Sequence, residues 1–142
     1  MNRDERDRLE ALRAPEIASE LQLAPDAHGG WSRTDGETTR HLLGIGDCLD
    51  WHRIVGDDEE WMHVAGGPLA LSLSPDGHDA SAQILGRGIA GGDATHATVP
   101  DGHWRTSEPL GEWALIERRT REGSDREDAP PGWRPIPRSA TA

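Results

Sequence analysis

Apolar and polar residues alternate along most of the chain in short runs, with the period of two that half-buried β-strands show. The clearest run is the predicted strand 68–74, where leucine falls on every second position from Leu69 to Leu73. Many short strands separated by turns indicate an all-β sandwich or barrel. Comparable runs, separated by glycine and proline, predict further strands over residues 31–34, 38–43, 51–55, 59–65, 81–85, 96–99, 103–106 and 112–119.

The two ends of the chain lack this alternation. Residues 2–13 are highly charged and predict a short surface helix, and Pro15 is well placed to begin a second helix over 15–21. Residues 123–142 are rich in proline and show no strand pattern. We therefore expect three segments: a charged N-terminal helix or arm over 1–14, one barrel domain over 15–128 and a Pro/Arg-rich tail over 129–142.

Side chains able to carry chemistry gather in the stretch 51–67. Its two strands flank a Gly-Asp-Asp turn at 56–58, which predicts a hairpin because glycine accepts a positive φ and aspartate caps its own backbone. The hairpin can therefore aim two imidazoles, a carboxylate and an indole into one space. Strand parity places five of its residues on inward faces: His52, Ile54, Glu59, Trp61 and His63.

The spacing within and after this stretch resembles the two motifs of the cupin superfamily. Between Gly46 and Gly66 the chain reads G-x5-H-x-I-x4-E-x6-G, and Ile54 stands where the first motif has its second histidine. The sequence PDGHWR at 100–105 resembles the second motif, with Arg105 where a metal-binding cupin has histidine. The resemblance therefore keeps His52 and Glu59 but loses two of the four metal-binding positions.

Local sequence around these motifs is similar to one small family, cupin 5, which is a domain of unknown function. The segments HGGWSR at 28–33, AGGPLALSL at 65–73 and PLGEWAL at 109–115 follow that family in order. The resemblance runs from about residue 15 to residue 128. It implies an all-β, cupin-type jelly-roll β-barrel, with a short N-terminal helical segment and an irregular C-terminal tail. A barrel of this size can hold one small ligand.

Composition and charge narrow the choice of partners. The net charge of −11 repels phosphate backbones and anionic lipid headgroups, so we expect neither nucleic acid nor membrane as a partner. No apolar run approaches the length of a membrane span, and no signal segment follows Met1. Cys48 is the only cysteine, which excludes an internal disulfide and a cysteine-based zinc site. We expect a cytoplasmic protein that binds a small molecule.

His52 is the best candidate for proton transfer, because the unperturbed pKa of imidazole, about 6.5, suits general acid or base chemistry. Glu59 could orient His52 or act as its conjugate partner. Alternatively, the two residues form a hydrogen-bonded interior pair that the fold retains. We assign His52 and Glu59 as the candidate catalytic residues.

Arg105 faces inward by the motif alignment, and a buried charge is costly unless it is paired. Three arrangements are open: an ion pair with Glu59, a bidentate bond to an anionic ligand, or a position at the barrel mouth in contact with water. We assign Arg105 to ligand binding. Trp61 offers a stacking surface. The other candidate ligand-binding residues are His63, Trp31, Arg33 and His103.

These residues favour a small-molecule enzyme of the isomerase, epimerase or lyase type, which acts on a polar, anionic metabolite by general acid–base chemistry. Two alternatives remain open: a non-catalytic cupin that binds a sugar-like or nucleotide-like metabolite, and a metal-dependent cupin oxygenase. We expect no cofactor and no metal, because Ile54 has no donor atom and Arg105 is a cation, which leaves only His63 as a third ligand. The resemblance to small cupins, whose subunits commonly pair, predicts a homodimer.

Overall fold

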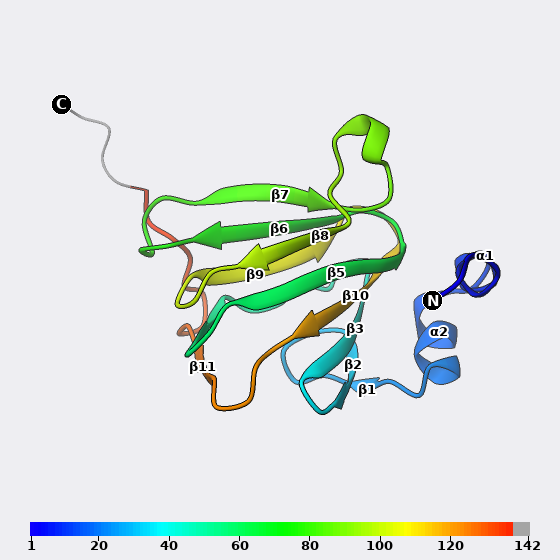
Figure 1. The fold of residues 1–142 in the computed structure, drawn as a ribbon, viewed down its shortest axis with the longest axis horizontal. Coiled ribbons are helices and arrows are strands. Elements are labelled where there is room, and N and C mark those ends of the chain that lie inside the picture. Colours follow the sequence, from blue (N-terminus) through cyan, green and yellow to red (C-terminus); the bar gives the residue numbers. More distant parts are fainter. Residues whose placement is uncertain (138–142) are drawn as a thin grey trace.

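The computed structural model describes residues 1–137 and consists of two antiparallel sheets that face each other, with two short helices to one side (Figure 1). The structure confirms the predicted all-β fold class with a short N-terminal helical segment. The six-stranded sheet has the order β1 (Ala24–Pro25), β2 (Trp31–Asp35), β3 (Thr38–Gly44), β10 (Trp113–Arg119), β5 (Glu59–Gly66) and β8 (His96–Val99). The five-stranded sheet has the order β11 (Asp125–Asp128), β4 (His52–Val55), β9 (Trp104–Pro109), β6 (Leu69–Ser74) and β7 (Ser81–Leu85).

An apolar cluster fills most of the space between the sheets. The alternating leucines of β6 supply Leu69 and Leu71 from one sheet, and Trp61 reaches them from the other. Burial of each leucine contributes about 1.5–3 kcal/mol, so this cluster is a main source of the attraction between the sheets. Its buried members are Leu43, Leu49, Trp61, Leu69, Leu71, Leu85, Val99, Ala114 and Ile116.

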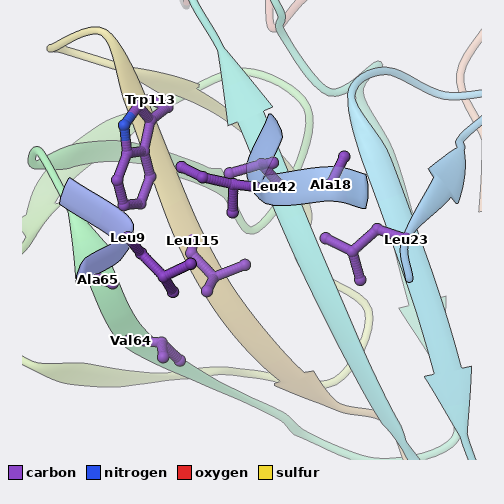
Figure 2. Close-up of a cluster of buried hydrophobic side chains, with 9 residues drawn as sticks. Leu9, Ala18, Leu23, Leu42, Val64, Ala65, Trp113 and Leu115 are labelled. Atoms are coloured by element: carbon purple, nitrogen blue, oxygen red, sulfur yellow. The ribbon is translucent and has the colours of Figure 1, made fainter. Parts of the chain in front are cut away.

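The helices α1 (Arg3–Glu10) and α2 (Ala14–Glu20) cover the outer face of the six-stranded sheet. The side chain of Asn2 caps α1 by accepting a hydrogen bond from the backbone N–H of Glu5 at 2.8 Å. Leu9 is fully buried, so the highly charged first helix is anchored to the barrel. Figure 2 shows the second apolar cluster, formed by Leu9, Ile17, Ala18, Leu23, Leu42, Val64, Ala65, Trp113 and Leu115.

The predicted hairpin over 51–65 is wrong. β4 pairs with β9 and β11 in the five-stranded sheet, whereas β5 pairs with β8 and β10 in the six-stranded sheet. The segment 56–58 links the two strands, but turn chemistry does not decide which strands exchange hydrogen bonds. The chain therefore crosses between the sheets here. As a result, His52 and Glu59 enter the interior from opposite sheets instead of lying side by side on one.

The C-terminal part contains a strand that the sequence analysis did not predict. β11 pairs antiparallel with β4, although all four of its residues are charged. After β11, Trp133 packs against Trp51 and Trp104, with ring centroids 5.7 and 4.7 Å apart. The tail to residue 137 thus lies along the five-stranded sheet, and the remainder of the predicted tail, 138–142, lies outside the described residues.

The short segment η1 (Ile89–Gly91) interrupts the glycine-rich loop between β7 and β8. In the described part of the chain, neither helix is long and apolar enough to cross a membrane.

Candidate functional site

Glu59 forms the centre of a buried polar cluster at one end of the space between the sheets. It is fully buried at the start of β5, and its carboxylate accepts hydrogen bonds from Trp61 Nε1 at 2.6 Å and Arg105 Nη1 at 2.9 Å. The hydroxyl of Thr120 donates a third bond to its other oxygen. Burial raises the pKa of the Glu59 carboxyl, but the arginine charges and these hydrogen bonds outweigh burial and hold it below its usual value. Glu59 is therefore a fixed carboxylate rather than a proton carrier.

Arg105 takes the first of the three arrangements left open by the sequence. Its guanidinium is fully buried and forms an ion pair with Glu59 at 2.9 Å. Its Nε and Nη2 both donate to the backbone carbonyl of His103, at 3.2 and 2.9 Å. Removing one partner of such a buried pair strands the other charge. Arg105 is thus committed to the protein itself.

His52 lies opposite Glu59 in β4, and its ring is held in one orientation. Its Nδ1–H donates to the backbone carbonyl of Asp50 at 2.9 Å, which leaves Nε2 as the nitrogen with the free lone pair. Nε2 is buried and has no hydrogen-bond partner among the described residues. Burial, together with the positive charges of Arg126 and Arg118, lowers the pKa of His52 to about 3. The imidazole is therefore neutral at physiological pH and can accept a proton.

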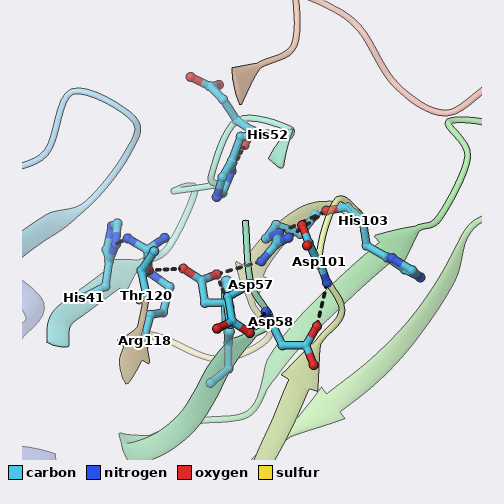
Figure 3. Close-up of polar contacts among 12 residues, drawn as sticks. His41, His52, Asp57, Asp58, Asp101, His103, Arg118 and Thr120 are labelled. Atoms are coloured by element: carbon cyan, nitrogen blue, oxygen red, sulfur yellow. Dashed lines mark hydrogen bonds and ion pairs between the residues drawn. The ribbon is translucent and has the colours of Figure 1, made fainter. Parts of the chain in front are cut away.

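Three further residues of the cluster were missed by the sequence analysis: His41, Arg118 and Arg126. Arg118 Nη2 donates to His41 Nδ1 at 3.1 Å, and His41 Nε2–H donates to the carbonyl of Gly29 at 2.7 Å. The Arg118 guanidinium also lies over the Trp61 ring, 5.5 Å from its centroid. Figure 3 shows Arg118 beside His41, with the His52 ring pointing toward them from above.

A sequence signal for two of these three residues exists. Arg118 shares strand parity with Ala114 and Ile116, and His41 shares it with Leu43, so each is a polar residue on an inward apolar face. A polar residue on a buried face indicates a specific structural or functional role more strongly than an exposed polar residue does. Arg126 carries no comparable signal, because its strand has no apolar residue to define an inner face.

Four of the predicted ligand-binding residues lie apart from this cluster. His63 is buried further along β5, where its Nε2–H donates to the Gly67 carbonyl. Burial lowers the pKa of His63, and the charges that act on it are those of Arg87, Asp93 and Arg6, not that of Glu59. Its strand also has an irregular register against β10, between Leu115 and Ile116.

The remaining three belong to the outer parts of the barrel. Trp31 packs against the apolar cluster under the helices. Arg33 is exposed, donates to Gln22 at 2.9 Å and pairs with Asp35 at 3.2 Å. His103 contributes its backbone carbonyl to the cluster, while its ring points away in Figure 3. We therefore do not include these side chains in the candidate site.

The donor set does not fit the metal that many cupins hold. Among residues 1–137, no three His, Cys, Asp or Glu side chains lie together as possible metal ligands. The two motif positions that lack a ligand are Ile54, which is buried, and Arg105, which is bonded to Glu59. We therefore derive no chemical step through a metal.

The larger surface hollows lie beside this cluster and reach it at Asp50, Trp61 and Arg118. One, of about 520 Å³, is bounded by residues 48–51, Thr106 and the tail residues 129–134. Another, of about 360 Å³, lies on the outer face of the six-stranded sheet next to Met62. Neither is lined by His52 or Glu59.

Comparison with known proteins identifies the family and the fold. The family described as Cupin superfamily (DUF985), cupin 5, matches residues 32–128. No curated protein matches the chain.

Solved structures match over most of the chain. A protein from Shewanella oneidensis has a TM-score of 0.74 and 21% identity, covering 83% of this chain and 85% of its own. A hypothetical protein from Leishmania major has a TM-score of 0.65 and 21% identity, covering 75% and 80%. A dTDP sugar isomerase from Desulfovibrio desulfuricans has a TM-score of 0.57 and 22% identity, covering 82% and 86%. At these identities the matches show the cupin fold.

Proposed function

The chain belongs to the cupin 5 family of the cupin superfamily (DUF985), and from this premise we propose that it is a small-molecule enzyme of the isomerase, epimerase or lyase type. It acts by general acid–base chemistry inside the barrel, with His52 as the base. One observation carries the proposal: the Nε2 lone pair of His52 is buried, lacks a partner and is held in place through Nδ1. Buried histidine nitrogens usually have a partner. His63 Nδ1 is also unpartnered, but only His52 faces Arg118 and Arg126 in the interior cluster.

The surroundings of His52 leave Nε2 free to take a proton, but burial and the charges of Arg126 and Arg118 disfavour the imidazolium until an anionic ligand offsets those charges. Its neutral form accepts a proton at Nε2, and the carbonyl of Asp50 stabilises the imidazolium that results, because Nδ1–H keeps its acceptor. The His52 ring points toward the side of the cluster where Arg118 lies (Figure 3), and the charge of Arg118 acts on His52. A cation there stabilises the negative charge that develops when a substrate C–H or O–H loses its proton.

Glu59 and Arg105 have a different role from the one expected from the sequence. Glu59 does not bond to His52, since its oxygens accept from Trp61, Arg105 and Thr120. We propose that this ion pair fixes the interior end of the site. The dTDP sugar isomerase that shares the fold supports the view that such a barrel can accommodate isomerase chemistry.

Hydrogen exchange tests this function without knowledge of the product. The protein is incubated in D2O with sugar nucleotides and with small hydroxy and keto acids, and proton NMR follows deuterium entering their C–H positions. We expect His52→Gln to lower the exchange rate of an active compound at least 100-fold, within the usual contribution of a general base. His103→Gln, whose ring lies outside the cluster, is the matched control and should exchange at the wild-type rate.

Two outcomes would contradict the proposal. An exchange rate that survives His52→Gln would remove His52 as the base. Tight binding of a compound with no exchange at any of its positions would favour the non-catalytic binding protein instead.

A further inference from the structure

Unpartnered nitrogen atoms converge in the interior cluster. Besides His52 Nε2, the buried atoms without a hydrogen-bond partner include Arg118 Nε and Arg126 Nη2. A buried donor without an acceptor costs about 1–3 kcal/mol, and more when it is charged. Two such donors are therefore an expensive arrangement unless a ligand or a bound water satisfies them.

Strand register places both arginines on inward faces, because Arg126 pairs with the buried Ile54 of β4 and Arg118 pairs with the buried Trp61 of β5. Arg126 and Arg118 both disfavour protonation of His52, and the charge of Arg126 lowers the pKa of Arg118. Arg126 also acts on His41 of the opposite sheet. The cluster thus joins a side chain from the edge strand β11 to side chains from β3, β4 and β10.

Acidic residues of the chain do not neutralise Arg118 directly. Its side chain is only 7% exposed, yet among the described residues no carboxylate lies at ion-pair distance from it. Glu59 is near enough to act on its charge but is bonded to Arg105, Trp61 and Thr120. A buried guanidinium normally has a hydrogen-bonded carboxylate or phosphate as its partner.

Arg126 shows where an anion would enter. Its Nε donates to Asp128 at 2.7 Å, and 27% of its side chain is exposed, so it reaches from the protein surface into the cluster. Asp128 in turn interacts electrostatically with His28, in the loop before β2. Arg126 therefore lies where the edge of the five-stranded sheet approaches this loop of the six-stranded sheet.

We propose that Arg118 Nε and Arg126 Nη2 form a binding site for an anionic oxygen group, a carboxylate or a phosphate, next to His52. Both arginines donate to the anion, while His52 Nε2 faces the adjoining part of the ligand. The inference rests on the proposed function only in taking the anion to be part of the substrate. Arg118 and Arg126, which were not assigned from the sequence, thus take the anion-binding role expected of Arg105, which is bonded to Glu59.

The anion site can be tested by binding alone. Isothermal titration calorimetry with sodium phosphate and, separately, sodium acetate is performed at constant ionic strength on the wild type, Arg118→Met and Arg126→Met. We expect each variant to bind the preferred anion at least tenfold more weakly than the wild type. The anion with the higher affinity identifies whether the site takes a phosphate or a carboxylate.

Arg119→Met is the matched control, because it removes the same charge from the next position of the same strand. Arg119 is 61% exposed and pairs loosely with Glu37 at 3.7 Å, so this variant should bind as the wild type does. If Arg118→Met fails to fold, Arg126→Met on the edge strand decides the question alone. The proposal is overturned if the wild type binds neither anion more tightly than Arg126→Met, or if Arg119→Met loses as much affinity.

The failures of the two proposals can be told apart. Anion binding in a protein that catalyses no hydrogen exchange would leave the anion site intact and remove the enzyme. Hydrogen exchange that depends on His52, in a protein that binds neither anion, would support the enzyme and contradict the anion site.

Discussion

At the residue scale, the interior cluster contains two kinds of arginine. Arg105 has its charge matched by Glu59 and its N–H groups bonded to the His103 carbonyl, so it belongs to the scaffold. Arg118 and Arg126 retain unpartnered buried nitrogens, so they can take a ligand. This difference follows from hydrogen-bond satisfaction and cannot be read from residue type or strand parity.

The Glu59–Arg105 pair gives a prediction about stability. Arg105→Met leaves Glu59 as a buried carboxylate without its cation, and we expect a loss of about 3–5 kcal/mol in the free energy of unfolding. The double variant Glu59→Gln, Arg105→Met removes both charges and should recover part of that loss, which urea unfolding measures. Equal stability of the single and double variants would show that the two charges are not coupled.

Sequence analysis identified much of this cluster because inward parity and motif spacing agree. His52, Glu59, Trp61 and Arg105 are all buried. Their hydrogen bonds could not be predicted, because they depend on Thr120 and on the carbonyls of Asp50 and His103. Thr120 and Asp50 stand out neither by residue type nor by position in a motif, and His103 contributes its backbone carbonyl instead of the ring that the sequence singled out.

At the element scale, the strands were predicted more reliably than their partners. The alternating leucines of β6 and the turn after β4 both correspond to observed elements. However, β4 and β5 belong to different sheets, since pairing is decided by contacts distant in sequence. β11 was missed because Asp125–Asp128 is wholly charged, and it forms because β4 offers it an edge to pair with.

The tail after β11 gives the second prediction. Trp133 packs against Trp51 and Trp104, and each aromatic contact of this type contributes about 0.5–1.5 kcal/mol beyond the buried area. We expect Trp133→Ala to lower the free energy of unfolding by about 1–3 kcal/mol. Ile136→Ala is the control, because Ile136 is 68% exposed and should change stability little. Equal losses in both variants would contradict a specific role for the aromatic contacts.

At the scale of the whole molecule, the two apolar clusters have different structural roles. The outer cluster attaches the helices to the six-stranded sheet, and the inner cluster joins the two sheets. The polar cluster occupies the remaining interior, where the apolar residues of the inner cluster keep water out of one end. In this setting a neutral imidazole and unpaired guanidinium donors are far more sensitive to an anion than they would be in water.

The assembly of the molecule gives the third prediction. Small cupins commonly pair, and closed two-fold dimers are the most frequent oligomers. We predict that sedimentation velocity at micromolar concentration yields a species of about twice the chain mass of 15.5 kDa. A single species at the chain mass would contradict the homodimer.

The central claim is that His52 is a neutral base beside an anion site, and one pH titration tests it most directly. NMR follows the ring signals of His52, assigned by comparison with His52→Gln, in the presence and absence of sodium phosphate. Without phosphate, burial and the charges of Arg126 and Arg118 lower the pKa of His52 to about 3, so we predict no titration of its ring above pH 5.

The direction of the linked stability change follows from the same pKa. Because the folded-state pKa lies below the unfolded value of about 6.5, the unfolded chain binds the proton first. His52 thus contributes stability above about pH 6.5 that is lost as the pH falls toward 3. Bound phosphate offsets the arginine charges, so we predict that it raises the pKa of His52 into the measured range. Titration of the free protein near 6.5, or a His52 titration that phosphate does not change, would contradict the claim.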